Sequence, residues 1–288
     1  MQSIYDVLAP AKFNLFLHIT GRRADGYHLL QSVFMLIDWC DTLHFDLAPN
    51  GQISREDLLT PLPADDLVVR AARALRVASG TRLGAHIGIE KRVPAQAGMG
   101  GGSSDAASTL LALNRLWQLN YSLEKLQQIG LTLGADVPFF LGGHNAWVEG
   151  IGELLTPIQL PKKRFLVVKP AEGLDTKLIF LDPDLKRDTQ TAIISGFAAD
   201  AKFGCNDLQS VAQRHCPAVT KALQWLESQG LHGRMTGSGS AVFAPVPESF
   251  ELVSVSSTWQ LRLCNSLEVH PLAGWAGSNG LSVPSASL

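Results

Sequence analysis

Residues 94–107 read PAQAGMGGGSSDAA, and this stretch joins an expected strand, which begins at Leu83 and ends at Pro94, to an expected helix that ends near Trp117. Glycine occupies positions 98, 100, 101 and 102, and Ser103, Ser104 and Asp105 follow. Glycines let backbone N–H groups approach a ligand closely. A helix that begins behind them adds unpaired N–H donors and the positive end of a dipole. The stretch therefore predicts a cradle for an anion, such as the phosphates of a nucleotide.

The cradle fits neither of two common phosphate-binding patterns. A P-loop places Lys after its last glycine, and no Lys follows here. A dinucleotide fingerprint requires a third glycine where Ser103 stands. A flexible turn with an N-cap serine is the alternative, but four glycines in five positions are costly to order. We expect Gly100 and Gly101 to adopt backbone angles that are closed to residues with a Cβ atom.

Composition sets the background of an ordinary globular protein. The chain has 288 residues, 46% of them apolar, and a net charge of −2, which gives no electrostatic case for nucleic acid or an anionic membrane. Its four cysteines form no C-x-x-C pair and suit reduced thiols in a cytosol. The N-terminus is not typical of a signal peptide, so we expect a cytoplasmic protein.

Strands and helices mix without regular βαβ alternation, which favours the α+β class. Residues 12–19 alternate as a strand, 33–38 and 42–47 are expected to form a strand pair, and Asp65 or Asp66 is expected to cap a helix over 67–78. Farther along, we expect a strand over 165–169, a helical region over 206–229 interrupted by Pro217, and a strand over 234–245 interrupted by residues 237–240. Residues 250–259 are expected to be helical or mixed, and 260–267 a strand.

Three polar residues stand out as candidates for chemistry. Lys12 and Asn14 lie two apart on an expected strand, so their side chains leave the same face, where they can hold a substrate oxygen and neutralise a transferring phosphoryl group. Asp136 lies between two apolar segments, where it either caps a helix or is a partly buried carboxylate facing Lys12. A solvated strand face is the alternative for Lys12 and Asn14. Lys91 and Arg92 are interpreted as solvated charges.

Three segments together resemble the GHMP kinases. They are Pro10–Leu15, the 94–107 stretch, and Met235–Ser240, which alone would be interpreted as a hairpin turn. Residues 21–28, 134–140 and 149–153 resemble more narrowly those members that phosphorylate a hydroxyl of a cytidine-diphosphate sugar alcohol. The likeness runs from about residue 6 to 272.

The resemblance implies a two-domain fold in which ATP and substrate meet in a deep cleft. It places an N-terminal domain similar to ribosomal-protein-S5 domain 2 at 1–155, a C-terminal ferredoxin-like domain at 156–273, and a flexible tail at 274–288. ATP is the implied co-substrate, and Mg²⁺ is expected from the reaction class. The implied partners are small molecules only, with no nucleic acid or membrane, in a monomer or weak homodimer.

The resemblance also assigns roles to individual residues. Lys12 and Asp136 are the implied catalytic pair, and Asn14 joins them at the acceptor hydroxyl. The base of the substrate would lie between Tyr27 and Phe180, with His28 reading its edge and Thr176 as a further contact. The implied ATP site consists of Asp66, Pro94, Gly98, Gly100, Gly101, Gly102, Ser103 and Ser104. Ser104 is also the candidate ligand of the Mg²⁺ ion.

Two alternatives remain beside this interpretation. Another GHMP kinase of the homoserine or mevalonate type would need no aromatic sandwich, so Tyr27 and Phe180 discriminate. A nucleotide-binding regulator that lost catalysis would not need Lys12, Asn14 and Asp136. Asp66 departs from the expected pattern, since Asn usually contacts adenine at that position.

Overall fold

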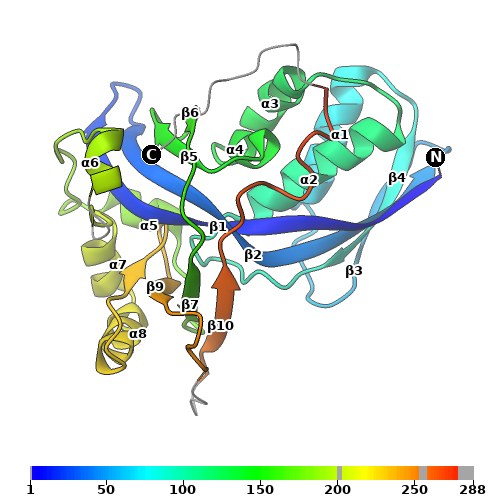
Figure 1. The fold of residues 1–288 in the computed structure, drawn as a ribbon. Helices are drawn as coiled ribbons and strands as arrows, with labels where there is room; N and C mark the ends of the chain where they lie inside the picture. The colour runs from blue at the N-terminus through cyan, green and yellow to red at the C-terminus, as the bar shows by residue number, and fades with distance from the viewer. Residues whose placement is uncertain (1, 200–202, 253–257, 278–288) are drawn as a thin grey trace.

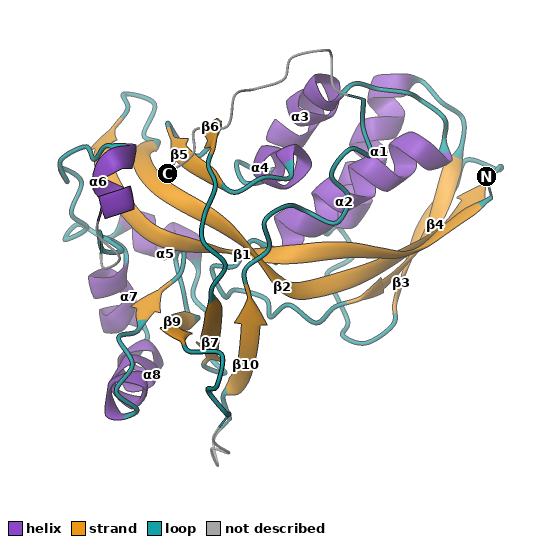
Figure 2. Ribbon diagram, viewed as in Figure 1, coloured by secondary structure: helices purple, strands orange, loops and turns teal. Residues whose placement is uncertain are grey.

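The computed structural model describes residues 2–199, 203–252 and 258–277, and these form two β-sheets with helices beside each (Figures 1 and 2). In the larger sheet the strand order is β3-β4-β2-β5-β6, with β1 paired to β2. Its strands are β1 (Ser3–Arg22), β2 (His28–Ala48), β3 (Ile53–Asp57), β4 (Gly84–Glu90), β5 (Ala146–Glu149) and β6 (Leu154–Pro157). Four helices lie together on one side of it: α1 (Leu67–Ser79), α2 (Gly101–Leu116), α3 (Leu123–Leu131) and α4 (Val137–Gly142).

The antiparallel hairpin of β1 and β2 is the longest feature of the molecule (Figure 1). Its register runs from Ser3 opposite Asp46 to Arg22 opposite His28. The strand pair expected over 33–38 and 42–47 is wrong, because both segments belong to β2. No Gly or Pro lies between them, and β1 continues alongside to pair with both segments. Register shifts between Pro10 and Lys12 and after Asn14 mark bulges, which re-aim side chains locally.

The smaller sheet is fully antiparallel, in the order β10-β7-β9-β8. It is built from β7 (Arg164–Lys169), β8 (Arg234–Met235), β9 (Val242–Val246) and β10 (Gln260–Asn265), with α5 (Thr176–Leu181), α6 (Ile194–Ala199), α7 (Gln209–His215) and α8 (Pro217–Ser228). Pro217 begins α8, as the sequence predicted. Half of the segment 250–259, residues 253–257, lies outside the described ones, and its described residues belong to no helix.

Two hydrophobic cores correspond to the two sheets, and the long hairpin takes part in both. Phe34 and Phe45 of β2 pack with Leu110 of α2 in the first core. Leu17 and Ile19 of β1 pack with residues of α7 and α8 in the second. Burial of such apolar side chains is the main stabilising contribution to each unit. The hairpin therefore fixes one unit against the other.

The end of the described chain folds back on the first unit. Arg115 of α2 donates to the carbonyl of Trp275 and stacks 4.2 Å from its ring. The remainder of the expected tail, 278–288, lies outside the described residues, and the domain limits at 155 and 273 stay predictions. Within the described part of the chain, no helix is both long and apolar enough to cross a membrane.

Candidate active site

A cavity of about 690 Å³ lies where the glycine-rich stretch, β1 and the second unit meet. It brings together residues from each segment that carries the resemblance except 21–28. Those of the expected site residues that line it are Lys12, Asn14, Asp66, Pro94, Gly98, Gly100, Gly101, Gly102, Ser103, Asp136, Thr176 and Phe180. Tyr27, His28 and Ser104 do not line it.

The glycine-rich stretch ends at the first turn of α2, whose N-terminus opens on the cavity. Gly100 is the N-cap with φ +70°, and Gly98 has φ +71°, both in the left-handed region that favours glycine. A Cβ atom on Gly98 would stand 2.1 Å from the carbonyl oxygen of Thr236. Gly101 does not have a positive φ, so the expectation for it is wrong. A Cβ atom there would instead crowd Lys91 Nζ and Val93 Cγ1, both at 3.0 Å.

Thr236 joins the three segments that carry the resemblance. Its hydroxyl accepts a hydrogen bond from the backbone N–H of Asn14 at 2.9 Å and donates to the carbonyl of Gly98 at 3.3 Å. The backbone N–H of Lys12 donates to Met99 at 3.0 Å. The buried hydroxyl thus fixes β1, the glycine-rich stretch and the 235–240 turn in one arrangement.

Lys12 and Asp136 approach each other at the cavity wall. Lys12 Nζ lies 3.5 Å from Asp136 Oδ2 and donates to Asn14 Oδ1 at 2.5 Å, while Phe34 lies beneath the ammonium at 4.3 Å. Asn14 is oriented in turn by Ser32, since its amide donates to Oγ at 2.9 Å. Burial lowers the pKa of Lys12, and the charge of Asp136 opposes that shift.

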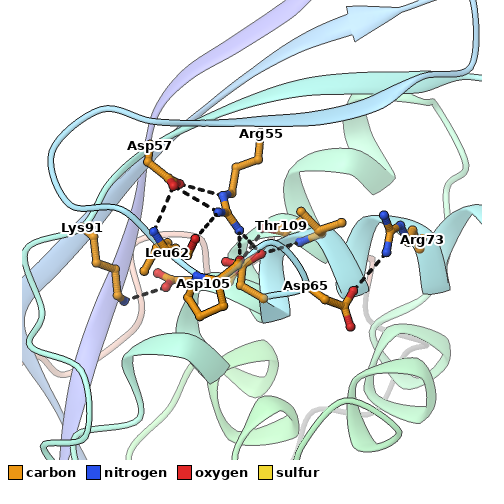
Figure 3. A network of polar contacts seen from close by, with 11 residues as sticks. Arg55, Asp57, Leu62, Asp65, Arg73, Lys91, Asp105 and Thr109 are labelled. Carbon is orange, nitrogen blue, oxygen red and sulfur yellow. Dashed lines mark hydrogen bonds and ion pairs between the residues drawn. The ribbon is translucent and has the colours of Figure 1, made fainter.

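Lys91 is not a solvated charge, contrary to the expectation from sequence. Its ammonium pairs with Asp41 and lies 2.6 Å from Asp105 Oδ2 (Figure 3), and all three side chains are buried. Burial raises the pKa of Asp105 to about 8, and the nearby charge of Lys91 opposes the rise. Asp41 also accepts from the backbone N–H groups of Arg92 and Val93. The cluster ties the exit of β4 to the first turns of α2.

Asp66 is held by a second charge cluster, of which Arg55 and Asp57 are labelled in Figure 3. It caps α1 by accepting from Val69 N, and its Oδ1 lies 2.6 Å from Arg55 Nη1. The same guanidinium pairs with Asp57 at 2.7 Å and donates to the carbonyl of Leu62. The carboxylate that replaces the expected Asn is therefore neutralised by a half-buried network that shapes this part of the cavity wall.

The expected substrate end of the cavity is only partly assembled. Thr176 Oγ1 lies 2.6 Å from Ser238 Oγ, which links α5 to the glycine-serine turn. The His28 ring packs 5.2 Å from the ring of Phe180, at the rim. Tyr27, at the tip of the β1–β2 hairpin, is 60% exposed.

Ser103 and Ser104 differ in their access to the cavity. The residue Ser103 lines it, whereas Ser104 is fully buried and its Oγ has no hydrogen-bond partner among the described residues. No group of three or more His, Cys, Asp or Glu side chains in the described part of the chain could hold a metal ion. Mg²⁺ does not require such a cluster, since it is usually held by few protein ligands together with substrate phosphates.

Comparisons with known proteins place the chain in a family. Residues 66–144 match the GHMP kinases N terminal domain, and residues 193–261 match the GHMP kinases C terminal domain. The 4-diphosphocytidyl-2-C-methyl-D-erythritol kinase of Albidiferax ferrireducens is 75% identical over 287 residues, covering 99% of this chain and 100% of the relative. The chain belongs to the 4-diphosphocytidyl-2-C-methyl-D-erythritol kinases of the GHMP family.

Further relatives agree with this placement of the kinase. The enzyme of the same name from Variovorax paradoxus is 64% identical, covering 96% of this chain and 100% of the relative. A crystal structure of a 4-(cytidine 5'-diphospho)-2C-methyl-D-erythritol kinase matches with a TM-score of 0.70 and 36% identity, over 83% of this chain and 89% of that one. The GHMP kinase fold and the kinase activity that the sequence implied are thereby confirmed.

A match to another solved structure, at low sequence identity, supports the fold and not the substrate. Homoserine kinase from Cytophaga hutchinsonii matches with a TM-score of 0.68 over 94% of this chain and 96% of its own, at 14% identity. The same architecture thus serves a different alcohol, so the substrate must be argued from the residues of the cavity.

Sequence analysis misread the role of Lys91 and missed three other residues near the site: Asp41, Arg55 and Arg187. Each is a common charged residue in a segment without a motif, and for Lys91, Asp41 and Arg187 the role depends on a partner at least 50 residues away in the chain. Arg187, for example, donates from Nε to His28 Nε2 at 3.0 Å. Only the folded arrangement reveals such pairs.

Proposed function

We propose that this kinase transfers the γ-phosphoryl group of ATP to the hydroxyl at position 2 of 4-diphosphocytidyl-2-C-methyl-D-erythritol. One observation carries the proposal: a single cavity joins the glycine-rich helix start, the Lys12–Asp136 pair and Phe180. The names of the relatives support this substrate over the homoserine and mevalonate alternatives. A nucleotide-binding regulator that has lost catalysis would not need the buried Lys12.

ATP would bind with its phosphates at the N-terminus of α2. The first-turn N–H groups of an α-helix have no partner within the helix, and they face the glycine-rich stretch here. Gly98, Gly100, Gly101 and Gly102 leave space for the phosphates, with Pro94 beside them. Asp66 lines the region where the adenine would lie, and its carboxylate accepts hydrogen bonds only, so the adenine amino group is its natural partner.

The reaction itself needs little covalent chemistry from the protein. The acceptor oxygen bonds to the γ-phosphorus, the bond from that phosphorus to the β–γ bridging oxygen breaks, and ADP leaves. Lys12 would neutralise charge on the transferring group, and Asn14 would hold the ammonium in place. Asp136 would orient the acceptor hydroxyl and take its proton.

Mg²⁺ would complete the ATP site. Bound to phosphate oxygens, the ion would neutralise part of their charge. Ser103 lines the cavity, and Ser104 holds a buried hydroxyl with no partner among the described residues, so these two side chains fit a ligand role. In the Lys91 cluster, Lys91 pairs with Oδ2 of Asp105, whereas Oδ1 of the same carboxylate has no hydrogen-bond partner among the described residues and Asp105 lines the cavity, so this oxygen also fits a ligand role.

The cytidine end of the substrate would lie toward α5 and the β1–β2 hairpin. Phe180 would stack on the base from the cavity side, and Tyr27, exposed at the hairpin tip, would cover the other face. His28 lies against Phe180 and would read the edge of the base, while Thr176 would contact the substrate near Ser238. A cytoplasmic location, a monomer or weak homodimer, and small molecules as the sole partners stay predictions.

A parallel assay of ADP release tests the proposal. We expect turnover with ATP and the cytidine-diphosphate substrate, and background rates with homoserine and mevalonate. Phosphorus NMR of the product then locates the new phosphate on the position-2 oxygen. Faster turnover of homoserine or mevalonate would refute the substrate assignment, and ADP release without any acceptor dependence would refute the reaction.

A further inference from the structure

Arg187 lies between α5 and α6 and reaches both His28 and the backbone around Phe180. Its Nε donates to His28 Nε2 at 3.0 Å. Its two terminal nitrogens donate to four carbonyls, those of Phe180, Asp182, Pro183 and Leu185, at 2.7–3.3 Å. The guanidinium is thus fixed by several hydrogen bonds before any substrate binds, and its fork geometry leaves it little freedom to rotate.

This contact determines where His28 carries its proton. A guanidinium has five N–H donors and no acceptor, so His28 Nε2 must supply a lone pair. In neutral imidazole one nitrogen accepts and the other donates. The proton of His28 therefore resides on Nδ1, which becomes the hydrogen-bond donor that the ring presents to its surroundings.

The position of His28 makes that donor relevant to substrate binding. Its ring packs on Phe180, and Phe180 lines the cavity. The charged groups around the ring are Arg187 from the second unit and Arg22 from β1; burial and these two charges, in that order, lower the pKa of His28. Both cations disfavour a proton on Nε2, so they keep the ring in its neutral state.

We propose that Arg187 is a positioning residue for base recognition, which holds His28 as a neutral donor through Nδ1 toward an acceptor atom on the edge of the substrate's pyrimidine. The proposal rests on the function proposed above, since it takes the cytidine end to lie between Phe180 and His28. Cytosine offers two ring-edge acceptors, N3 and O2, and a donor on His28 suits either. Arg187 thereby acts on the substrate through His28 and touches no reacting atom.

Steady-state kinetics of the full-length kinase test the proposal. Arg187→Met should raise KM for the cytidine substrate by about five- to tenfold, the usual effect of losing one hydrogen bond, with KM for ATP unchanged. Arg214→Met is the matched control, because Arg214 pairs with the side chain of Asp182 in the same region. It should leave both constants unchanged.

A double-mutant cycle separates this role from a purely structural one. His28→Phe keeps the ring on Phe180 and removes both nitrogens. Arg187→Met should then cause no further loss in the His28→Phe background. An equal loss in both backgrounds would overturn the proposal, since it would mean that Arg187 supports the loop and not His28.

The pH dependence gives a second readout. Removing the charge of Arg187 raises the pKa of His28 toward 6.5. In the unmodified kinase, a proton on Nε2 at low pH would face the Arg187 guanidinium and break their contact, so KM for the cytidine substrate should rise as pH falls; in Arg187→Met no donor opposes Nε2 and protonated His28 still donates from Nδ1, so KM should change much less. Coincident profiles would count against the proposal.

Nitrogen-15 NMR of histidine-labelled kinase tests the proton position without substrate or turnover. We expect an unprotonated Nε2 and a protonated Nδ1 for His28, assigned by comparison with His28→Phe. A proton on Nε2 would overturn the inference even if the kinase turns over its substrate. Conversely, the expected tautomer in a protein that does not use the cytidine substrate would refute the proposed function alone.

Discussion

Lys12 Nζ lies 3.5 Å from Oδ2 of Asp136, although one residue belongs to the first strand and the other directly precedes α4. The lysine side chain is 5% exposed and the aspartate side chain 30% exposed. A buried cation thus meets a carboxylate that solvent and substrate can still reach. This asymmetry suits a fixed charge beside a group that exchanges a proton.

Substitutions at these two positions should show that they act together. Asp136→Asn should lower kcat by roughly 10²–10⁴ if the carboxylate takes the proton. The loss should be smaller if it only orients the hydroxyl, because Asn still accepts a hydrogen bond. Lys12→Ala should lower kcat severely in either case. The kcat of the double variant should fall about as far as that of the more damaging single variant. A fall equal to the product of the two single effects would indicate that the residues act independently.

The fall of kcat at high pH, the alkaline limb of the pH–rate profile, should result from deprotonation of Lys12. Burial lowers its pKa from the ordinary lysine value, so the protonated form disappears at a lower pH than for an exposed lysine. Because charge neutralisation needs that proton, kcat should fall as pH rises through the lowered pKa. Lys12→Arg should keep its charge and move this limb to higher pH, even if the plateau rate drops.

Lys169 offers a control for the pH experiment. It is also a buried lysine whose pKa burial lowers, but it donates to the carbonyls of Pro170 and Glu172. Lys169→Arg should leave the alkaline limb where it is. A limb that moves with Lys169 and not with Lys12 would contradict the assignment.

Gly98 should tolerate no side chain. A Cβ atom at this position would stand 2.1 Å from the carbonyl oxygen of Thr236, and φ is +71°. Gly80 has a similar φ of +67° with nothing within 4 Å of its Cβ position. Gly80→Ala should therefore cost only the backbone strain, about 1–2 kcal/mol.

Gly98→Ala should cost clearly more in urea unfolding and should abolish binding of a non-hydrolysable ATP analogue by calorimetry. Equal costs for the two variants would show that the close approach to Thr236 has no energetic consequence. Retained nucleotide affinity in a folded Gly98→Ala protein would contradict the phosphate cradle.

The sequence predicted local features well where one short segment carries the whole signal. The glycine stretch, the Asp66 cap of α1 and the break at Pro217 each follow from the preferences of a few adjacent residues. The strand expected to break between residues 38 and 42 does not, because pairing with β1 overrides a weak local pattern. Tertiary pairing, and not propensity, sets the length of β2.

The charged residues were harder to interpret from sequence. Lys91 and Arg92 are adjacent, yet Lys91 is buried between two carboxylates while Arg92 pairs with Glu90 at the surface. Nothing in the adjacent residues distinguishes the two. The partners of Lys91 are 50 and 14 residues away in the chain, so its role depends on a fold that composition does not reveal.

The aromatic residues allow a direct test of the cytidine site. Phe180 lines the cavity and contacts the second core, so Phe180→Ala removes both a ligand contact and packing. Tyr27 is 60% exposed at the hairpin tip, so Tyr27→Ala should leave the melting temperature nearly unchanged. A change in substrate binding caused by Tyr27→Ala therefore reports on a ligand contact alone.

If Tyr27 covers the base, Tyr27→Ala should raise KM for the cytidine substrate roughly tenfold, since stacking is worth about 1–3 kcal/mol per base. KM for ATP should not change, because the phosphate cradle lies at the other end of the cavity. Tyr27→Phe is the matched control and should keep the stacking face and the KM. An unchanged KM in Tyr27→Ala would mean that the base rests on Phe180 alone, and an equal rise for ATP would place the hairpin tip at the nucleotide site.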